Sequence, residues 1–409
     1  MGLSRRQKLA LKRSTATINI WYGSVRSSKT FGSLWDFIRV MTERSMGIND
    51  GGTVLLVGLS TNTVWRNIFQ PLLNDKQFKA FAPYVEYRQN APSGKFMGQP
   101  FSVVGANNEA SWLSIQGMTI AYCLGDEATG WPKSFWDMLL TRLSLPYSRL
   151  LVTCNPGAGT HYLKEVIDRA GIDPDIHAEK FLLHQNPTLA ASVVRRLKRS
   201  FTGLFYRRMI LGEWVAAEGA VFEGWNPETM VVPAEQVPEG HVLAVGLDYG
   251  TEHPSAGYAL TLSGGKLYLT HEWSPQVGVA GGRKRMTDFE LADSFQHFLE
   301  ALPQQPRYIY ADPAGASFRE ELKRRGIRTH KADNKVVDGI RTIDALLNAG
   351  VLMVSDACPN LIKGIPGYRW DTKKDDTPIK EDDDEVDGMR YTVYSCRHLW
   401  RRLVDFSPM

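Results

Sequence analysis

The sequence predicts an α/β protein with two domains, and three observations support this. In the first half, short β-rich runs alternate with helical patterns, which is typical of βαβ units and a largely parallel sheet. The second half opens instead with three antiparallel strands, after which helices and strands alternate. A length of 409 residues also allows two or three domains at about 150 residues each.

The first domain is expected to span residues 1–217. Its strands are expected at Ile18–Tyr22, Thr53–Leu59, Phe101–Val104, Thr119–Gly125 and Arg149–Cys154. Its helices are expected at Gly32–Thr42, Thr63–Asn74 and Ala191–Leu211, the last of these rich in Arg and Lys. Several Pro and Gly residues then indicate a linker over residues 218–240.

The second domain is expected to span residues 241–396, followed by a tail at 397–409. A strand at His241–Asp248 precedes a hairpin of Ala256–Leu262 with Lys266–Trp273. The elements expected next are helix Asp288–Ala301, strand Arg307–Asp312, helix Ser317–Arg325, strand Ile327–Lys331, helix Asp338–Asn348, strand Val351–Val354 and a helix from about Glu385. This is the element order of a ribonuclease-H-like domain.

Composition excludes several classes of protein. A hydrophobic share of 43% with 22% charged residues is that of folded proteins, so a disordered or collagen-like chain is excluded. The sequence has no apolar run of about 20 residues and no secretory leader at its basic start, so we expect an intracellular, non-secreted protein without a membrane segment. A net charge of +4 does not by itself indicate a polyanionic partner.

Residues 23–30 read GSVRSSKT and stand directly between the first strand and a helix. They fit the P-loop pattern G-x-x-x-x-G-K-[ST], except that Ser28 replaces the second glycine. Such a loop cradles phosphates with its backbone N–H groups, Lys29 reaches the β- and γ-phosphates, and Thr30 ligates Mg²⁺. The nucleotide ligands expected in the loop are Gly23, Ser24, Arg26, Ser27, Ser28, Lys29 and Thr30. The alternative is a Ser/Gly turn before a helix.

Asp126 and Glu127 follow an apolar strand, where paired carboxylates are costly unless they meet a cation or water. In an ATPase, Asp126 would hold the Mg²⁺ of ATP and Glu127 would polarise the attacking water. The alternative is a helix N-cap pair. Together with the loop, the pair predicts a P-loop NTPase domain that binds ATP and Mg²⁺.

Three acids in the second half suit a nuclease that uses two Mg²⁺ or Mn²⁺ ions. Asp248 and Asp312 end two strands that a ribonuclease-H-like sheet sets side by side, and Asp387 lies on the last helix. Hard divalent cations prefer oxygen ligands, and two such ions clamp the attacking and leaving oxygens of a phosphodiester. Asp384, or alternatively Asp383, is the expected fourth ligand. The alternative is that Asp248 and Asp312 are ordinary aspartates in the turns that follow their strands.

These motifs resemble those of the large terminase subunit, the DNA-packaging motor of tailed bacteriophages. The resemblance rests on GSVRSSKT with its in-loop Arg26, on LGDEA at 124–128, on RLLVTCNPG at 149–157 and on LGEW at 211–214. It implies catalytic roles for Arg26, Lys29 and Glu127. It also implies that Thr153 and Asn155 sense the γ-phosphate and couple hydrolysis to DNA movement.

The resemblance further implies the partners and the location. Double-stranded DNA, a portal protein and a small terminase subunit would be the partners, with a ring of copies on the procapsid and a monomer in free solution. The place of action would be the host cytoplasm, transiently on the viral procapsid. Basic clusters at 283–285, 323–325 and 373–374 are candidate contacts for DNA phosphates. Two rivals are a P-loop helicase or repair ATPase fused to a resolvase-like nuclease, and a non-catalytic capsid or scaffold component.

The sequence departs from the family pattern at two places. Some relatives carry an arginine before the Asp-Glu strand that acts on a neighbouring subunit's ATP, whereas this chain has Gln116. Arg142 and Arg149 are then the candidates for that trans-acting cation, and the alternative for each is a surface or structural role. Second, the position three before the last acid is often histidine in the family and is Asp384 here, so the fourth metal ligand stays open.

Overall fold

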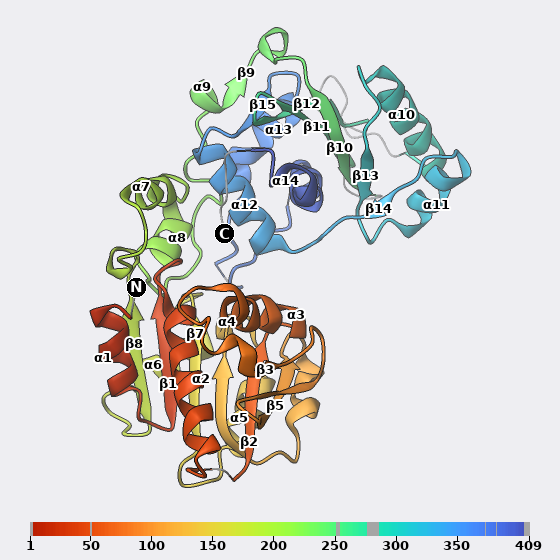
Figure 1. Ribbon diagram of the computed structural model, residues 1–409. Helices are drawn as coiled ribbons and strands as arrows, with labels where there is room; N and C mark the ends of the chain where they lie inside the picture. The colour runs from red at the N-terminus through yellow and green to blue at the C-terminus, as the bar shows by residue number, and fades with distance from the viewer. Residues whose placement is uncertain are drawn as a thin grey trace. The chain divides into compact units, whose positions relative to one another are not determined.

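The computed structural model describes residues 3–49, 51–250, 254–275, 286–372, 374–381 and 383–404. The chain divides into two compact units (Figure 1). Unit 1 comprises Met1–Val194 and Tyr206–Ala216, and unit 2 comprises Arg195–Phe205 and Ala217–Met409. The α/β fold class expected from the sequence is confirmed, with one sheet in each unit. No helix within the described ranges is long and apolar enough to cross a lipid bilayer.

Unit 1 is built on an eight-stranded sheet of order β3-β4-β5-β2-β6-β7-β1-β8. The strands are β1 (Ile18–Gly23), β2 (Thr53–Gly58), β3 (Val85–Glu86), β4 (Ser93–Phe96), β5 (Gln99–Gly105), β6 (Ile120–Gly125), β7 (Arg149–Cys154) and β8 (Ile176–Phe181). All neighbours pair in parallel except β3 with β4 and β4 with β5. The carboxyl ends of β6, β7 and β1 therefore meet at one edge.

Helices and helical turns cover both faces of this sheet. They are α1 (Arg5–Arg13), α2 (Lys29–Ser45), α3 (Thr61–Val64), the π-helix η1 (Trp65–Phe69), α4 (Gln70–Asn74), α5 (Lys133–Arg142), α6 (Tyr162–Asp168) and the 3-10 turns η2 (Ala82–Tyr84), η3 (Glu109–Ile115), η4 (Ala128–Gly130) and η5 (Leu183–Gln185). Leu34, Phe37 and Met41 form the buried stripe of α2 and pack with Trp21 in one core. Truncating such a core aromatic costs about 3–5 kcal/mol.

The basic stretch 191–211 is not one helix, so that prediction was wrong. It forms α7 (Ala191–Arg199), α8 (Gly203–Phe205) and the π-helix η6 (Tyr206–Ile210). Gly203 has a φ of +44°, outside the right-handed helical range, and breaks the run. A Cβ there would also lie 2.4 Å from the carboxyl carbon of Glu223, so any larger residue would have to displace that side chain.

Unit 2 is built on a seven-stranded sheet of order β14-β13-β10-β11-β12-β15-β9. The strands are β9 (Val231–Val232), β10 (His241–Asp248), β11 (Ala256–Ser263), β12 (Lys266–Trp273), β13 (Tyr308–Ala311), β14 (His330–Lys331) and β15 (Leu352–Ser355). Strands β10, β11 and β12 form the antiparallel meander, and β13 pairs in parallel with β10. The first and fourth strands of the expected ribonuclease-H-like order are thus neighbours, as predicted.

Apart from the segment Arg195–Phe205 described above, the helices of unit 2 lie between residues 227 and 400. They are α9 (Pro227–Met230), α10 (Asp288–Ala301), α11 (Ala316–Arg324), α12 (Val336–Asn348), α13 (Pro359–Gly364), α14 (Asp384–Ser395), α15 (Arg397–Trp400) and the 3-10 turns η7 (Ala234–Gln236) and η8 (Ile365–Gly367). Helix α14 packs closely on β10 and β11 (Figure 1). Two glycines permit this approach, because a Cβ on Gly246 would lie 2.3 Å from Thr392 N and one on Gly388 2.8 Å from Ala256 O.

Candidate functional site

The P-loop-like segment of unit 1, residues 23–30, joins the end of β1 to the start of α2. Ser28 is the N-cap of α2 and has left-handed backbone angles, φ 66° and ψ 24°. Glycine adopts this conformation at least cost, which explains why the common pattern has glycine where this chain has serine. Gly23 and Arg26 also have positive φ, at 131° and 53°, so the loop keeps the turned backbone that phosphate binding needs.

Lys29 points back into the loop. Its Nζ donates to Ser24 O at 2.7 Å, Gly23 O at 3.3 Å and Ser27 Oγ at 3.2 Å, and to Asn155 Oδ1 at 3.1 Å. Burial lowers the pKa of this ammonium to about 8. An anion in the loop would favour its charged form, so the lysine is poised to exchange carbonyl oxygens for phosphate oxygens.

Asp126 connects three segments at the same sheet edge. The hydroxyls of Thr30, at 3.1 Å, and of Thr153 donate to its Oδ1, and Asn67 Nδ2 donates to Oδ2 at 2.9 Å. The structure therefore brings Thr30, Asp126 and Thr153 together, and Lys29 with Asn155 beside them. A buried carboxylate next to a threonine hydroxyl is an oxygen donor set that suits Mg²⁺.

Glu127 follows Asp126 with a φ of 60°. Its Oε1 lies 3.9 Å from Arg66 Nη2, and its side chain is 38% exposed. The carboxylate is therefore accessible to water, as the role expected for Glu127 from the sequence requires. Arg26 is also exposed, and its carbonyl accepts a hydrogen bond from Asn186 Nδ2 at 2.7 Å.

In unit 2, Asp248 and Asp312 stand on neighbouring parallel strands. The register pairs Leu247 with Ala311, and Asp312 N donates to Leu247 O at 3.1 Å. Asp248 and Asp312 therefore lie at the same edge of the sheet, where β10 and β13 end. Asp384 and Asp387 are buried in the first turn of α14, which packs on the same strands.

The electrostatics of unit 2 show that these acids are neighbours. The pKa of Asp248 is raised well above its usual value, first by burial and then by the charges of Asp387, Asp312, Asp384 and Asp383, in that order. Three separate segments thus direct carboxylates to one place. Such repulsion is relieved by a cation, and carboxylate oxygens are the donors that Mg²⁺ and Mn²⁺ prefer.

Protein cations pair with part of this cluster. Arg390 Nη2 lies 2.9 Å from Asp387 Oδ2, and Lys380 Nζ lies 3.4 Å from that oxygen and 3.2 Å from Asp383 Oδ2. Tyr368 also donates its hydroxyl to Asp387 Oδ1 at 3.3 Å. Across the described ranges, no group of three or more His, Cys, Asp or Glu side chains has the arrangement of a ready metal site. Asp387 would have to turn from these partners for the carboxylates to share ions.

Comparisons with known proteins agree with this geometry. No protein-family model matches the chain. The large terminase of a thermophilic bacteriophage superposes with a TM-score of 0.84 at 27% identity, over 98% of this chain and 100% of that one. Over almost its whole length, the chain is thus similar to a large terminase. The same thermophilic phage's large terminase in complex with ATP-γ-S gives a TM-score of 0.81 at 28% identity, over 95% of this chain and 98% of that one.

A curated large terminase subunit, from Escherichia phage T5, is more distant. It is 22% identical over 282 residues, which cover 64% of this chain and 61% of the T5 protein. The chain thus spans about three fifths of that relative's length. The whole-chain superposition on the thermophilic phage protein shows that this chain has the fold of a large terminase.

Three residues near the loop 23–30 and the Asp126–Glu127 pair were not predicted from the sequence. Arg66 and Asn67, which contact Glu127 and Asp126, lie on the π-helix η1. Gln7 of α1 donates to Ser28 O at 3.1 Å and thereby supports the loop. The capping box of Ser4 with Gln7 could have revealed helix α1, but no motif indicates these contacts.

Arg149 does not suit a trans-acting role. Its guanidinium lies 2.9 Å from the fully buried Asp36 Oδ2, donates to Ser14 O at 3.0 Å and stacks 5.1 Å from the Tyr122 ring centroid. It also stands at the start of β7, at the other end of the strand from Asn155. Arg149 is therefore structural.

The structure describes only part of the basic clusters that the sequence offers as DNA contacts. Residues 283–285 lie outside the described residues, as does Lys373. In the cluster 323–325, Lys323 pairs with Glu320 at 3.5 Å, Arg324 with Glu321 at 3.5 Å and Arg325 with Asp293 at 3.2 Å. This cluster is largely neutralised by its own helix and its neighbour, which weakens its candidacy as a DNA contact.

Proposed function

We propose that the chain is an ATP-driven DNA-packaging motor subunit with a metal-dependent endonuclease. ATP hydrolysis in unit 1 drives double-stranded DNA into a procapsid, and unit 2 cuts concatemeric DNA. The observation that carries the proposal is the set of contacts at one sheet edge that joins Lys29 to Asn155 and Asp126 to Thr153. The complex of the thermophilic phage large terminase with ATP-γ-S supports ATP as the nucleotide.

In unit 1, the loop N–H groups and Lys29 bind the phosphates of ATP. Thr30 and Asp126 fit the Mg²⁺ that accompanies ATP, which neutralises phosphate charge when bound. Glu127 accepts the proton of the attacking water or orients it. The exposed guanidinium of Arg26 stands in the loop, where it stabilises charge on the transferred group.

Coupling follows from the contacts of β7. Asn155 accepts from Lys29, and Thr153 donates to Asp126. When Lys29 moves to the phosphates, Asn155 loses its donor, so the end of β7 responds to the state of the nucleotide. This is the route by which hydrolysis would reach the segments that grip DNA.

In unit 2, Asp248, Asp312, Asp387 and Asp384 fit two divalent cations, which activate water and stabilise the leaving oxygen when bound. Asp384 is favoured over Asp383 as the fourth ligand, because it raises the pKa of Asp248 more and because Asp383 pairs with Lys380. Arg390, one turn further along α14, holds Asp387 from one side.

The partners follow from the proposed activity. We expect double-stranded DNA, a portal protein and a small terminase subunit as partners, and a ring of copies on the procapsid formed from monomers in the host cytoplasm. The rival of a helicase or repair ATPase with a resolvase-like nuclease is disfavoured, because the superposition on a large terminase covers 98% of the chain. We propose that the ATPase domain ends at residue 217 and that the nuclease domain begins at residue 241.

The proposal is tested by Glu127→Gln in a packaging assay with procapsids. The variant keeps the shape of the site and should still bind ATP, but it lacks the carboxylate that handles the proton of water. We expect DNA protected from nuclease inside procapsids to fall by about 10²-fold or more. Glu165→Gln, an exchange on α6 in the same unit, is the matched control. Normal packaging by Glu127→Gln would refute an ATP-driven role for this site.

A further inference from the structure

Helix α7 (Ala191–Arg199) presents cations on one face. Arg195, Lys198 and Arg199 are exposed, and their spacing of three and four residues puts the three side chains on the same side of the helix. Leu197 lies on the opposite side and is buried. The basic face and the apolar face of α7 are therefore separate, and the basic face is open to a partner.

The charge of this face is not neutralised by the described part of the chain. Arg195, Lys198 and Arg199 make no ion pair with any residue that the structure describes. The helix sequence, ASVVRRLKR, contains no Asp or Glu. Like charges at these spacings destabilise a helix, so a face of this kind is stabilised when an anion binds to it.

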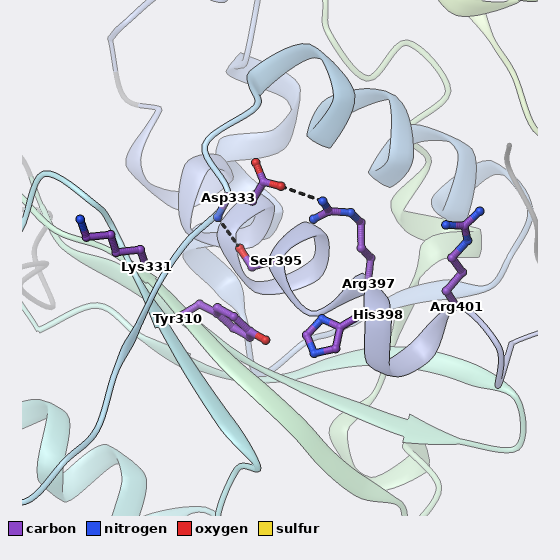
Figure 2. A pocket seen from close by; sticks show the side chains of 7 residues that line it. All are labelled: Tyr310, Lys331, Asp333, Ser395, Arg397, His398 and Arg401. Carbon is purple, nitrogen blue, oxygen red and sulfur yellow. Dashed lines mark hydrogen bonds and ion pairs between the residues drawn. The ribbon is translucent and has the colours of Figure 1, made fainter. Parts of the chain in front are cut away.

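Other cations of unit 2 are already engaged within the protein. The cluster 323–325 pairs with acids of its own helix and of α10. A pocket of about 310 Å³ lies beside Tyr310 and His398, and Figure 2 shows that its Arg397 pairs with Asp333, at 2.7 Å. The face of α7 thus offers what these two places do not, which is a group of cations without protein partners among the described residues.

The chain touches the loop 23–30 both before and after α7. Before the helix, Asn186 Nδ2 donates to Arg26 O at 2.7 Å. After it, Met209 O accepts a hydrogen bond from Val25 N at 2.8 Å. The segment that carries the basic face therefore leaves the phosphate-type loop and returns to it, so a load on α7 is felt at the loop from both sides.

The residues that follow α7 are anchored in unit 2, to which Arg195–Phe205 belong. Asn348 Nδ2 of α12 donates to Thr202 Oγ1 at 3.1 Å, and the ring centroid of Phe205 lies 6.5 Å from that of Trp370. The basic face is therefore carried by a helix on a packed base, which keeps its cations in a fixed order.

The spacing of the cations suits the phosphate backbone of double-stranded DNA. Arg195 and Arg199 are four residues apart, which is about 6 Å along the helix axis. Duplex DNA carries one negative charge for about each 1.7 Å of its axis, so its dense charge can meet all three cations together. An acidic protein would need several unpaired carboxylates within the same short span, which favours DNA as the partner.

We propose that Arg195, Lys198 and Arg199 of α7 form a surface that grips the backbone of double-stranded DNA during translocation. The inference rests on the proposed motor function and adds the surface through which the motor holds its substrate. The contacts are electrostatic and independent of sequence, as a motor that moves along a whole genome requires. The hydrogen bonds on both sides of α7 link this grip to the loop that binds the nucleotide.

The test measures binding of a fluorescent DNA duplex by anisotropy over a range of salt, with Mg²⁺ and ATP-γ-S present. The full-length chain carries Asp248→Asn throughout, so that the duplex is not cut. The variants replace Arg195 and Arg199 together, by Ala in one chain and by Glu in another. The matched control replaces Lys8 and Lys12 of α1 by Ala, because these are exposed cations at the same spacing. Thermal denaturation verifies folding.

We expect the Ala pair at 195 and 199 to raise Kd about tenfold and to reduce the slope of log Kd against log salt by about two. The Glu pair should raise Kd further, whereas the α1 pair should leave both quantities near those of the parent chain. Equal changes for the α7 and α1 pairs would overturn the α7 surface. A parent chain that does not bind the duplex would overturn the motor proposal, and the surface with it.

Lysine acetylation locates the contact independently of affinity. Mass spectrometry should show that the duplex protects Lys198 from acetylation but leaves Lys12 reactive. Lys198 that reacts equally with and without bound duplex would contradict the proposal. Variants at Arg195 and Arg199 that bind DNA normally but fail to package it would assign the face to a protein partner and overturn the assignment to DNA.

Discussion

Lys29→Ala is expected to abolish ATP hydrolysis, with a loss of at least about 10²–10³-fold, while Mn²⁺-dependent cleavage of plasmid DNA stays at the wild-type level. Lys29 Nζ makes four hydrogen bonds within the loop and to Asn155. Its replacement removes the ammonium that the loop holds in place for the phosphates. The nuclease acids belong to the other unit, so they keep their own fold. Hydrolysis is measured by phosphate release under single-turnover conditions.

The matched control for this variant is Lys133→Ala. Lys133 lies on α5 of the same unit, its side chain is 63% exposed, and it pairs with Asp137. It should leave both activities unchanged, because an exposed pair of this kind contributes about 1 kcal/mol or less to stability. Equal loss of ATPase and nuclease activities in Lys29→Ala would contradict the assignment of two separate sites.

Asp248→Asn and Asp312→Asn are each expected to abolish Mn²⁺-dependent DNA cleavage, by about 10³-fold or more, with ATP hydrolysis retained. Metal ions contribute several kcal/mol of transition-state stabilisation, and each 1.4 kcal/mol corresponds to about tenfold in rate. Removing one carboxylate from the set weakens the hold on the ions. Cleavage is followed by conversion of supercoiled plasmid to linear DNA.

Thermal stability in EDTA gives an independent test of Asp248→Asn. Asp248 is surrounded by four carboxylates that raise its pKa, so Asp248→Asn removes a repelled charge and should unfold at the same temperature as wild type or higher. Asp293→Asn, an exchange on α10 of the same unit with a 55% exposed side chain, is the control and should cut DNA normally. Undiminished cleavage by Asp248→Asn would move the metal site elsewhere.

Much of the ATPase site follows from element order. Residues that end neighbouring parallel strands meet at one edge, so a loop after β1, an acid pair after β6 and a polar pair after β7 come together once those strands are adjacent. The sequence indicates each strand end, although it does not reveal that β6, β7 and β1 are neighbours. That order depends on packing across the whole sheet.

The residues that were missed depend on local geometry without a sequence signal. Arg66 and Asn67 reach the acid pair because Trp65–Phe69 forms a π-helical turn inside an otherwise α-helical stretch. The error at 191–211 arose because Gly203 breaks a run whose composition favours helix. In unit 2, the pocket joins Tyr310 to His398 across a strand and a short helix far apart in the chain, and no spacing indicates that meeting.

The central claim is that one chain holds a nucleotide site in unit 1 and a separate divalent-ion site in unit 2. It is tested most directly by anomalous diffraction from crystals soaked in Mn²⁺ and ATP-γ-S. We expect one Mn²⁺ peak beside Thr30 and Asp126 with the nucleotide on the loop, and a second group of peaks among Asp248, Asp312 and Asp387. Nucleotide on the loop with Mn²⁺ bound away from those three acids would contradict the claim.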